Sequence, residues 1–432
     1  LQEFEGAFAS THGRTDAHMT LNPHNESTRP LAYLLWGSGS LEGRAWLSGA
    51  GFAVSSYRPP AVTRTIAEDE GPREVRARHS IDVEEAAEYD LDPSDPEDIM
   101  FFWGAHVWNH RDVIETTLEV APDDHYLQDF AEPAWEAYRE LEAAGRSTDP
   151  DPNKSAMTRA NVYTKTTPAW QLSCVQDYRK GRYGFQQHVW QATLSDRAVV
   201  YTTHPRRVDL KDRPDYWRGD GVLPRVGAHD GLLWSLYRSD PDDVDTIPEG
   251  AVDLRPDTFC EFTHAFVPRY AFDDVREVGN WVAGRAGDGY VGLYSSGQTR
   301  WEPLEEAVIE KLAPPDAEDW DPGRCDLIAD GYENVWLCEL GRRATHGGFD
   351  AFLDELAEAT VEGDADRAVY ESPRRGRVEF GWDRPLTVDG ESIALDGYDR
   401  LDTPYGTVPF GTTTYDFRAG DDELHLPLGP SE

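Results

Sequence analysis

The segment from Gln176 to Ala192 (QDYRKGRYGFQQHVWQA) gathers side chains that are suited to binding and to acid–base chemistry. Lys180-Gly181-Arg182 is typical of a turn, and the alternation after it predicts a strand. Amides hydrogen-bond to hydroxyls and an indole covers the apolar face of a sugar, so the strand favours a carbohydrate ligand. The alternative is that His188 is a satisfied, half-buried histidine. One face would carry Tyr183, Phe185, Gln187 and Val189, and the other Gly184, Gln186, His188 and Trp190.

Residues 159–218 carry a net positive charge, whereas the chain as a whole is strongly negative. The sequence holds 41 Lys+Arg and 81 Asp+Glu, a formal net charge of −40. Within this window we count eleven cations and five acids, a local balance of +6. A cationic patch on a polyanion favours an anionic substrate, with Arg179, Arg182 and His204 as candidate contacts. The alternative is that these cations pair with acids elsewhere in the chain.

Two other groups of residues could carry chemistry. The run STHGRT at 10–15 is a polar turn that offers His12 and Arg14, although a capped loop would have the same composition. His106 and His110 are four residues apart and could share a helix face that binds a metal ion. No third ligand is evident, so we interpret them as surface histidines and place no metal. His204 and His264 are interpreted as structural, although His204 lies inside the cationic window and is therefore also a candidate contact.

Several familiar signatures are absent from the sequence. It contains no GxSxG elbow, no HExxH and no P-loop. Gly284, Gly287 and Gly289 are better explained by a hairpin than by a nucleotide-binding loop. The 81 acidic residues make chance carboxylate pairs unavoidable, so a glycosidase pair is neither supported nor excluded. The four cysteines lie far apart and are interpreted as buried thiols.

Helical patterns occupy the first 150 residues or so. Ser94 and Glu97 form a capping-box pattern before an apolar run at 99–102, and Asn109 is placed to cap a helix that carries Ile114 and Thr117. A further helix is expected over 130–144, with Gly145 as its C-cap. The polar, Pro-bearing run at 146–155 is typical of a linker. These patterns predict a helical domain over 1–150.

Strand patterns dominate from residue 156 to residue 432. The run at 334–340 is apolar on both faces, as in a central strand. Asp288-Gly289 and Asp389-Gly390 mark hairpins, and one helix is expected near 349–357. Short strands separated by tight turns predict a large antiparallel β-sandwich. Further strand runs lie at 199–203 and 377–382.

The composition limits partners and environment. The acidity is spread along the chain and only five lysines are present, which is typical of a protein from a halophile. Duplex binding depends on broad phosphate neutralisation, so nucleic acid is not expected as a partner. No apolar run reaches the roughly 20 residues of a membrane helix. The chain begins at Leu1 without a signal-peptide pattern, so we expect a removed leader or a start within a longer polypeptide. The cytoplasm of a high-salt organism is favoured, and secretion stays open.

The segment from Thr158 to Pro205 resembles a family of largely uncharacterised proteins from bacteria, fungi and archaea. Tyr290–Arg300, Leu327–Gly341 and Tyr370–Gly381 carry the same resemblance. That family is similar to polysaccharide lyases of the heparinase II/III and alginate-lyase architecture. The resemblance implies a helical α/α toroid followed by an antiparallel β-sandwich. About 150 helical residues would make only part of a toroid, so either earlier helices are missing from this sequence or the toroid is truncated. The expected protein partner is a second copy of the chain or a missing N-terminal part of the same polypeptide.

The resemblance also implies a reaction. Such lyases cleave an anionic, uronic-acid-containing polysaccharide by β-elimination, for which no redox cofactor is required and a structural metal ion is optional. His12 and Arg14 would act from the helical side, with Tyr183 and His188 on the sandwich side. A glycoside hydrolase and a non-catalytic carbohydrate-binding or assembly protein are the alternatives. The remaining substrate contacts would be Arg179, Arg182, Gln187, Trp190 and His204.

Overall fold

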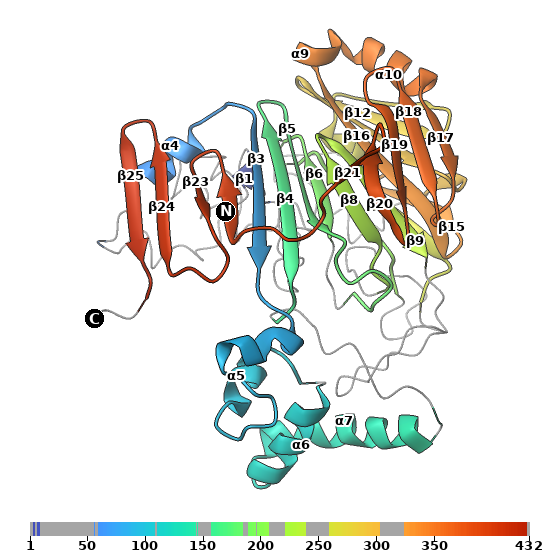
Figure 1. The fold of residues 1–432 in the computed structure, drawn as a ribbon. Helices are drawn as coiled ribbons and strands as arrows, with labels where there is room; N and C mark the ends of the chain where they lie inside the picture. Colours follow the sequence, from blue (N-terminus) through green and yellow to red (C-terminus); the bar gives the residue numbers. More distant parts are fainter. Residues whose placement is uncertain are drawn as a thin grey trace, which may run out of the picture.

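Antiparallel β-strands make up most of the structure, which is a computed structural model (Figure 1). The β-rich fold expected from the strand patterns is therefore confirmed. The structure describes residues 3–4, 7–8, 56, 59–108, 110–143, 145, 157–184, 189–195, 197–206, 221–238, 259–302 and 324–429.

The largest sheet has ten strands. Its middle is a run of four antiparallel neighbours, β4 to β7, that follow one another in the sequence. Distant segments extend the sheet at both ends, so its register depends on non-local pairing. In spatial order the strands are β14 (Thr299–Glu302), β15 (Asp326–Asp330), β10 (Phe262–Phe266), β7 (Val199–Thr203), β6 (Trp190–Thr193), β5 (Trp170–Gln176), β4 (Ala160–Thr167), β3 (Arg73–His79), β22 (Leu401–Thr403) and β23 (Gly406–Val408).

A six-stranded sheet packs against one face of the ten-stranded sheet. Its central strand β16 (Glu333–Arg342) confirms the strand expected at 334–340, because it is buried on both faces. Trp336 and Cys338 lie in the core shared with the ten-stranded sheet, whereas Val335 and Leu337 lie in the core on the opposite side. The other strands are β11 (Asp274–Val278), β12 (Trp281–Ala286), β13 (Gly289–Ser295), β9 (Leu232–Arg238) and β8 (Arg225–His229).

A five-stranded sheet and a helix cover the other face of the six-stranded sheet. Helix α10 (Phe349–Glu358) confirms the helix expected near 349–357, and its apolar side joins this second core. Figure 1 shows the resulting stack, with the six-stranded sheet in the middle. The strands are β17 (Thr360–Gly363), β18 (Ala368–Ser372), β19 (Gly376–Gly381), β20 (Arg384–Val388) and β21 (Glu391–Ile393), and α9 (Arg343–His346) precedes α10.

Three helices form a separate group below the sheets in Figure 1. They are α5 (Ile99–Gly104), α6 (Arg111–Val120) and α7 (His125–Ala143). The expected helices are confirmed with shifted starts: α6 has His110 as its N-cap instead of Asn109, and α7 begins five residues before 130. The capping box is formed by Asp82 and Glu85 at the turn η1 (Val83–Tyr89), and not by the Ser94 pattern. Gly145 has a positive φ, as expected of a C-cap.

The expected division into a helical 1–150 and a β-rich 156–432 is wrong at β3. This strand lies within the expected helical part, yet it pairs with β4 from Arg73↔Thr166 to His79↔Ala160. Its sequence REVRARH alternates, but its charged side chains conceal a strand from a search for apolar periodicity. The helices α5 to α7 are therefore an insertion between two paired strands of the large sheet.

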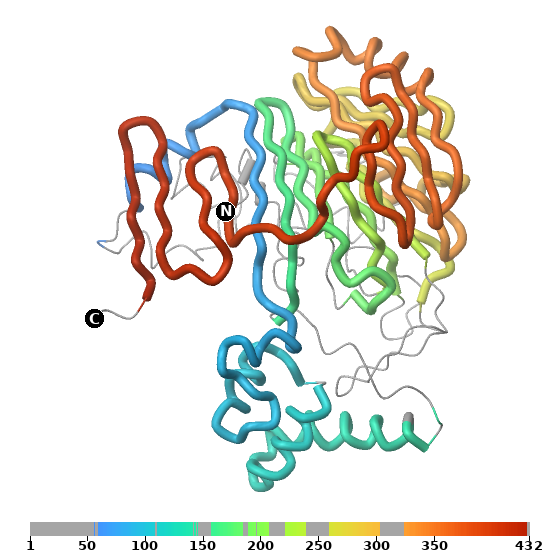
Figure 2. The backbone as a smooth tube through the Cα atoms, viewed as in Figure 1, coloured from blue at the N-terminus to red at the C-terminus, as the bar shows by residue number. Residues whose placement is uncertain are grey.

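The C-terminal segment returns to the ten-stranded sheet. Figure 2 shows the chain leaving β21 and crossing β4 and β3 to reach β22. Asn161 accepts a hydrogen bond from the Tyr398 amide at 3.3 Å, and the Arg78 amide donates to the Asp399 carbonyl at 2.7 Å. None of the helices in the described parts of the chain is long and apolar enough to cross a membrane. The remaining elements are β1 (Glu3–Phe4), β2 (Ala7–Phe8), α4 (Ala61–Ala67), η5 (Arg269–Ala271), β24 (Thr414–Ala419) and β25 (Asp422–Pro427).

Candidate functional site

Four of the site residues expected from the sequence lie outside the described residues: His12, Arg14, Gln187 and His188. Their roles remain predictions. The structure places the other five, which are Arg179, Arg182, Tyr183, Trp190 and His204.

The sugar-stacking role expected for Trp190 is wrong. Its side chain is 0% exposed and lies in the core between the ten-stranded and six-stranded sheets. Its indole nitrogen donates to Thr202 Oγ1 at 2.8 Å, which satisfies the only polar group of the ring. The strand expected to carry both Tyr183 and Trp190 is also wrong, because β6 begins at Trp190 and Tyr183 lies in an isolated bridge to Val222.

His204 is a structural residue, which confirms one of its two interpretations and corrects the other, a contact with substrate. Its Nδ1 accepts a hydrogen bond from the Val222 amide at 3.0 Å. A ring nitrogen that accepts carries no proton, so the proton is on Nε2, which donates to the Cys260 carbonyl at 2.7 Å. Burial lowers the pKa of His204 to about 4, and the ring is neutral near pH 7. A Cβ at Gly221 would lie 2.8 Å from this ring, which requires glycine there.

Tyr183 belongs to a cluster of buried side chains whose chemistry suits ligand binding and proton transfer. The Arg206 guanidinium lies 5.9 Å from the centroid of the Tyr183 ring, within cation–π range, and the Phe259 ring lies 6.4 Å from it. A second isolated bridge pairs Arg206 with Phe259. Tyr183, Arg206 and Phe259 are each 6% exposed. A buried arginine beside a phenol can bind a carboxylate and supply a proton donor. We call Tyr183, Arg206 and Phe259 the Tyr183 cluster.

A hydrogen-bonded triple lies on the neighbouring strands β7, β10 and β15. His264 Nε2 is 2.9 Å from Asp326 Oδ1, and its Nδ1 is 3.0 Å from Thr203 Oγ1. A carboxylate only accepts, so with Asp326 ionised the proton is on Nε2 and Nδ1 faces the hydroxyl of Thr203. This is the order of roles found in an acid–base–hydroxyl triad. Such an imidazole can accept a proton at Nδ1 from a group that replaces the hydroxyl.

The backbone register places the triple and the Tyr183 cluster at the same end of β7 and β10. Thr203 directly precedes His204, and the register pairs Thr203 with His264. Beyond that pair the same two segments pair again at Arg206 and Phe259. The structure thus places a buried cation, a phenol and an imidazole at the same end of two neighbouring strands. The interpretation of His264 as purely structural did not foresee this, and neither did the choice of Arg179 and Arg182 as the candidate cations.

Several cations of the 159–218 window are engaged in ion pairs. Lys165 pairs with Asp230 at 3.2 Å, and Lys180 pairs with Asp383 at 3.0 Å. Arg159 contacts both Asp82 and Glu85. For these three cations the alternative reading, pairing with distant acids, is confirmed. Arg179 lies over the Tyr178 ring at 5.7 Å, and Arg182 is exposed to solvent.

The possible metal site at His106 and His110 does not form on a helix face. Helix α5 ends at Gly104 and α6 begins at Arg111, so both histidines lie in the connection. His106 has a φ of 61° and its ring packs 4.9 Å from Trp108. Across the described ranges, no group of three or more His, Cys, Asp or Glu side chains is placed to hold a metal ion.

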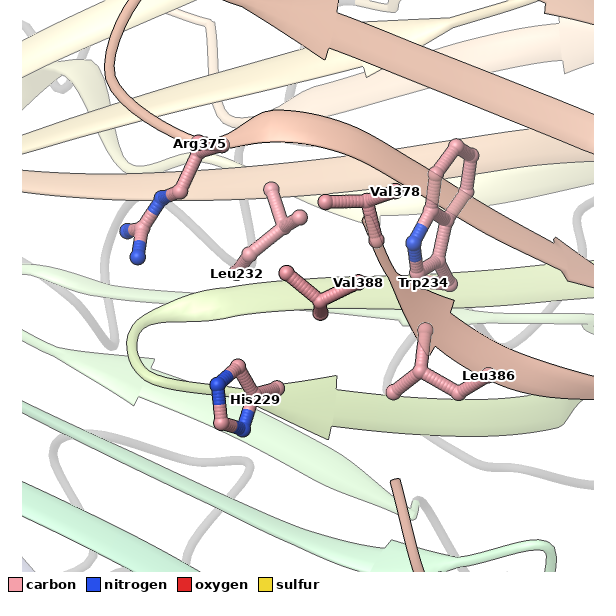
Figure 3. Close-up of a pocket in the computed structure, with 7 residues that line it drawn as sticks. All are labelled: His229, Leu232, Trp234, Arg375, Val378, Leu386 and Val388. Atoms are coloured by element: carbon pink, nitrogen blue, oxygen red, sulfur yellow. The ribbon is translucent and has the colours of Figure 1, made fainter. Parts of the chain in front are cut away.

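A small cavity lies between the six-stranded and five-stranded sheets. Its volume is about 20 Å³, enough for one water molecule and too small for a sugar. Figure 3 shows its lining side chains, which come from β8, β9, β19 and β20 and from the turn before β19. They are mostly aliphatic, with Trp234, His229 and Arg375 as the polar members. This cavity is therefore not the substrate site.

Sequence reasoning could not assemble the triple from local signals. Thr203 and His264 are 61 residues apart, and His264 and Asp326 are 62 apart. Only the alternation of the runs VVYTT, FTHAF and DLIAD indicates that each residue lies on a strand. Which strands pair is decided by packing. Arg206 was available as a member of the cationic window.

No protein-family model matches the chain, and no curated protein matches it.

Proposed function

We propose that this protein cleaves a uronic-acid-containing polysaccharide by β-elimination at the β7–β10 end of the ten-stranded sheet. The observation that carries the proposal is the buried Arg206 against the ring of Tyr183, at the same end of β7 and β10 as the Thr203–His264–Asp326 triple. The stacked antiparallel sheets would be the β-sandwich of the lyase architecture, and α5 to α7 part of its helical toroid. The resemblance described above supports the first assignment. The second departs from its order of domains, because α5 to α7 lie between the paired strands β3 and β4.

The residues divide the chemistry as follows. Arg206 binds the uronate carboxylate and stabilises the negative charge that develops on it. His264 Nδ1 accepts the C5 proton once the ligand displaces the Thr203 hydroxyl, and Asp326 holds the proton on Nε2. The electron pair of the C5–H bond forms the C4–C5 double bond while the C4–O bond breaks. Tyr183 then donates a proton to the leaving oxygen.

The direct test is an ultraviolet assay in high salt. The folded protein is incubated with alginate, glucuronan, pectate and glycosaminoglycans, and absorbance of the unsaturated uronate is followed. Tyr183→Phe should lower kcat by about 10²- to 10⁴-fold, the usual contribution of a general acid. The matched control is Tyr405→Phe, which removes a phenol hydroxyl that donates a hydrogen bond to Asp69 and does not belong to the Tyr183 cluster. This variant should leave the rate unchanged.

Each other outcome has a defined meaning. If no polymer raises the absorbance while circular dichroism shows a folded protein, β-elimination is wrong. New reducing ends without the chromophore would indicate a glycoside hydrolase. A non-catalytic binding protein is the second candidate, favoured by the ion pairs of Arg159, Lys165 and Lys180, which leave fewer cations for a polyanion. It predicts binding without product from any polymer.

A further inference from the structure

The helical insertion between β3 and β4 concentrates exposed apolar side chains. Seven large hydrophobic side chains are exposed in the described parts of the chain, and five of them lie in this insertion. Tyr126, at the start of α7, is 67% exposed, and Met100 on α5 is 63% exposed. Gatherings of exposed apolar groups on a protein mark interaction surfaces. The other three are Tyr89, Phe101 and Val120.

Four rings form a continuous row from the α5–α6 connection to α7, which we call the aromatic row. The ring centroids of His106 and Trp108 are 4.9 Å apart, those of Trp108 and Phe130 are 5.3 Å apart, and those of Phe130 and Tyr126 are 5.5 Å apart. Trp108 and Phe130 are half-buried and pack on Trp103, which lies in the core of the insertion. His106 and Tyr126, at the two ends, are exposed. The row is therefore anchored on a packed core and accessible from solvent.

The insertion is also strongly acidic. Residues 81–143 contain 19 Asp+Glu and two arginines, a net charge of −17 out of the −40 of the whole chain. Arg111 and Arg139 lie 5.6 and 5.9 Å from the centroid of the Trp135 ring, and Arg111 pairs with Glu142 at 3.0 Å. Both cations of the insertion are thus placed at Trp135, which does not belong to the aromatic row.

A carboxylate lies beside the exposed end of the row. Asp129 follows Tyr126 by three residues on α7 and is exposed. Residues at i and i+3 are neighbours on a helix surface, so the Asp129 carboxylate is next to the Tyr126 side chain. A guanidinium or ammonium group over the Tyr126 ring gains a cation–π contact and can reach this carboxylate. The carboxylate of a ligand would be repelled there.

We propose that the aromatic row docks a segment of a partner protein that carries both apolar and arginine or lysine side chains. The apolar side chains pack on the half-buried rings, and the cations lie over the exposed ring of Tyr126 and pair with the carboxylates around it. A general acidity of the chain accounts for the carboxylates, but it does not account for aromatic and aliphatic side chains in contact with water.

The charge of the insertion also selects against other occupants. Two copies of this chain would bring two surfaces of charge −17 together, and a uronate polymer would bring its own carboxylates, so both are repelled. The inference goes beyond the proposed function and does not depend on it.

Calorimetry in about 1 M sodium chloride tests the docking surface, because a screening length of about 3 Å suppresses long-range attraction to the acidic chain. The probe is a peptide of about ten residues in which leucine and arginine alternate. The wild type should bind it, and should not bind the same peptide with glutamate in place of arginine. Tyr126→Ala/Asp129→Asn should weaken binding by about tenfold, through loss of a cation–π contact and of apolar contact.

The matched control is Leu428→Ala/Asp421→Asn. It removes an apolar side chain that is 65% exposed and one exposed carboxylate, both outside the insertion. The net charge changes by the same amount as in the first variant, so the affinity for the leucine–arginine peptide should stay at the wild-type value. A similar loss in both variants would show attraction to the acidic chain as a whole and would overturn the proposal.

Hydrogen exchange locates the bound peptide without any variant. Protection on α5, α7 and the connection between α5 and α6 supports the proposal, whereas protection confined to the sheets overturns it (Figure 1). The proposal is also wrong if the wild type does not bind the peptide, or if a serine–arginine peptide binds equally well. A dimer that Tyr126→Ala/Asp129→Asn dissociates would identify a second copy as the occupant. Peptide binding by a protein that cleaves no polymer keeps the docking surface and refutes the lyase.

Discussion

His204 lies in the cationic window, where the sequence predicts a contact with substrate. The fold instead requires a neutral imidazole ring at this position. Both nitrogens bond to backbone groups, on Val222 and Cys260, that come from segments far apart in the sequence. The neighbouring His264 has a carboxylate on one nitrogen and a hydroxyl on the other. What distinguishes the structural histidine from the candidate base is therefore the chemistry of the partners and not the burial, which is similar for both.

Acid should destabilise the protein partly through His204. Its pKa is lowered from the ordinary 6.5 to about 4, so the unfolded chain binds this proton before the folded protein does. The contribution of His204 to the free energy of unfolding is therefore fully present above pH 6.5. It is lost as the pH falls from 6.5 to 4, and the total loss is roughly 3 kcal/mol. Urea unfolding at fixed high salt between pH 7 and pH 4 measures it.

The control for this prediction is His204→Gln, which removes the titrating group. Burial also lowers the pKa of His79, His229 and His346, so the wild type keeps a pH dependence from those rings. The variant should be less stable at pH 7 and should lose less free energy of unfolding on acidification. Equal slopes in the two proteins would show that folding does not lower the pKa of His204.

At the scale of elements, a chain of ion pairs connects the three sheets. Lys165 on β4 pairs with Asp230 in the β8–β9 turn at 3.2 Å. Arg375, between β18 and β19, donates to the Asp230 carbonyl at 2.6 Å and to Glu339 on β16 at 2.6 Å. Since Glu339 is only 3% exposed, this pair is shielded from the screening that weakens surface pairs.

Breaking the buried pair should be costly. Glu339→Gln removes the buried carboxylate that faces the Arg375 guanidinium and leaves only the half-exposed Asp230 carboxylate, at 3.4 Å, as its counterion. We expect the free energy of unfolding to fall by about 3 kcal/mol. The matched control is Glu423→Gln, which breaks the pair between Arg418 and Glu423 on the β24–β25 hairpin, where both side chains are mostly exposed. Denaturant unfolding should show no measurable change there. Similar losses in the two variants would contradict the role of the buried pair.

At the scale of the whole molecule, the net charge of −40 is the dominant property. Helix α7 illustrates it, because Glu132, Glu136 and Glu140 are exposed at i, i+4 spacing and repel one another. The cations in the ion pairs described above neutralise acids in the interior and between sheets. Those cations therefore do not neutralise the many acidic side chains on the surface.

Salt should therefore raise the stability of the protein. The screening length falls from about 10 Å at 0.1 M to about 3 Å at 1 M salt, which removes most self-repulsion. We expect the melting temperature to rise across that range in sodium chloride. Glu132→Gln/Glu136→Gln/Glu140→Gln should melt higher than the wild type at low salt and equally at high salt. A melting temperature that is independent of salt would refute the halophilic reading of the composition.

The local pattern of residues predicted many elements well. The apolar run around Trp336 indicates a strand buried on both faces, and Gly289 and Gly390 mark their hairpins, because these signals depend on periodicity and turn chemistry. The pattern failed at Arg73–His79, where charged side chains conceal a strand that is fixed by pairing with β4. The pattern also failed at Trp190. Alternation along a strand assigns side chains to two faces but does not tell which face is buried.

The sequence by itself determined the β-rich fold, most turns and helices, and the extreme acidity, because each depends on neighbouring residues or on composition alone. Only the tertiary structure decided the candidate site. Thr203, His264 and Asp326 meet through the order of β7, β10 and β15. Arg206 lies over the Tyr183 ring although each residue is bridged to another segment, Arg206 to Phe259 and Tyr183 to Val222. Such contacts are set by the packing of whole sheets against shared cores, and no local pattern encodes which distant strands become neighbours.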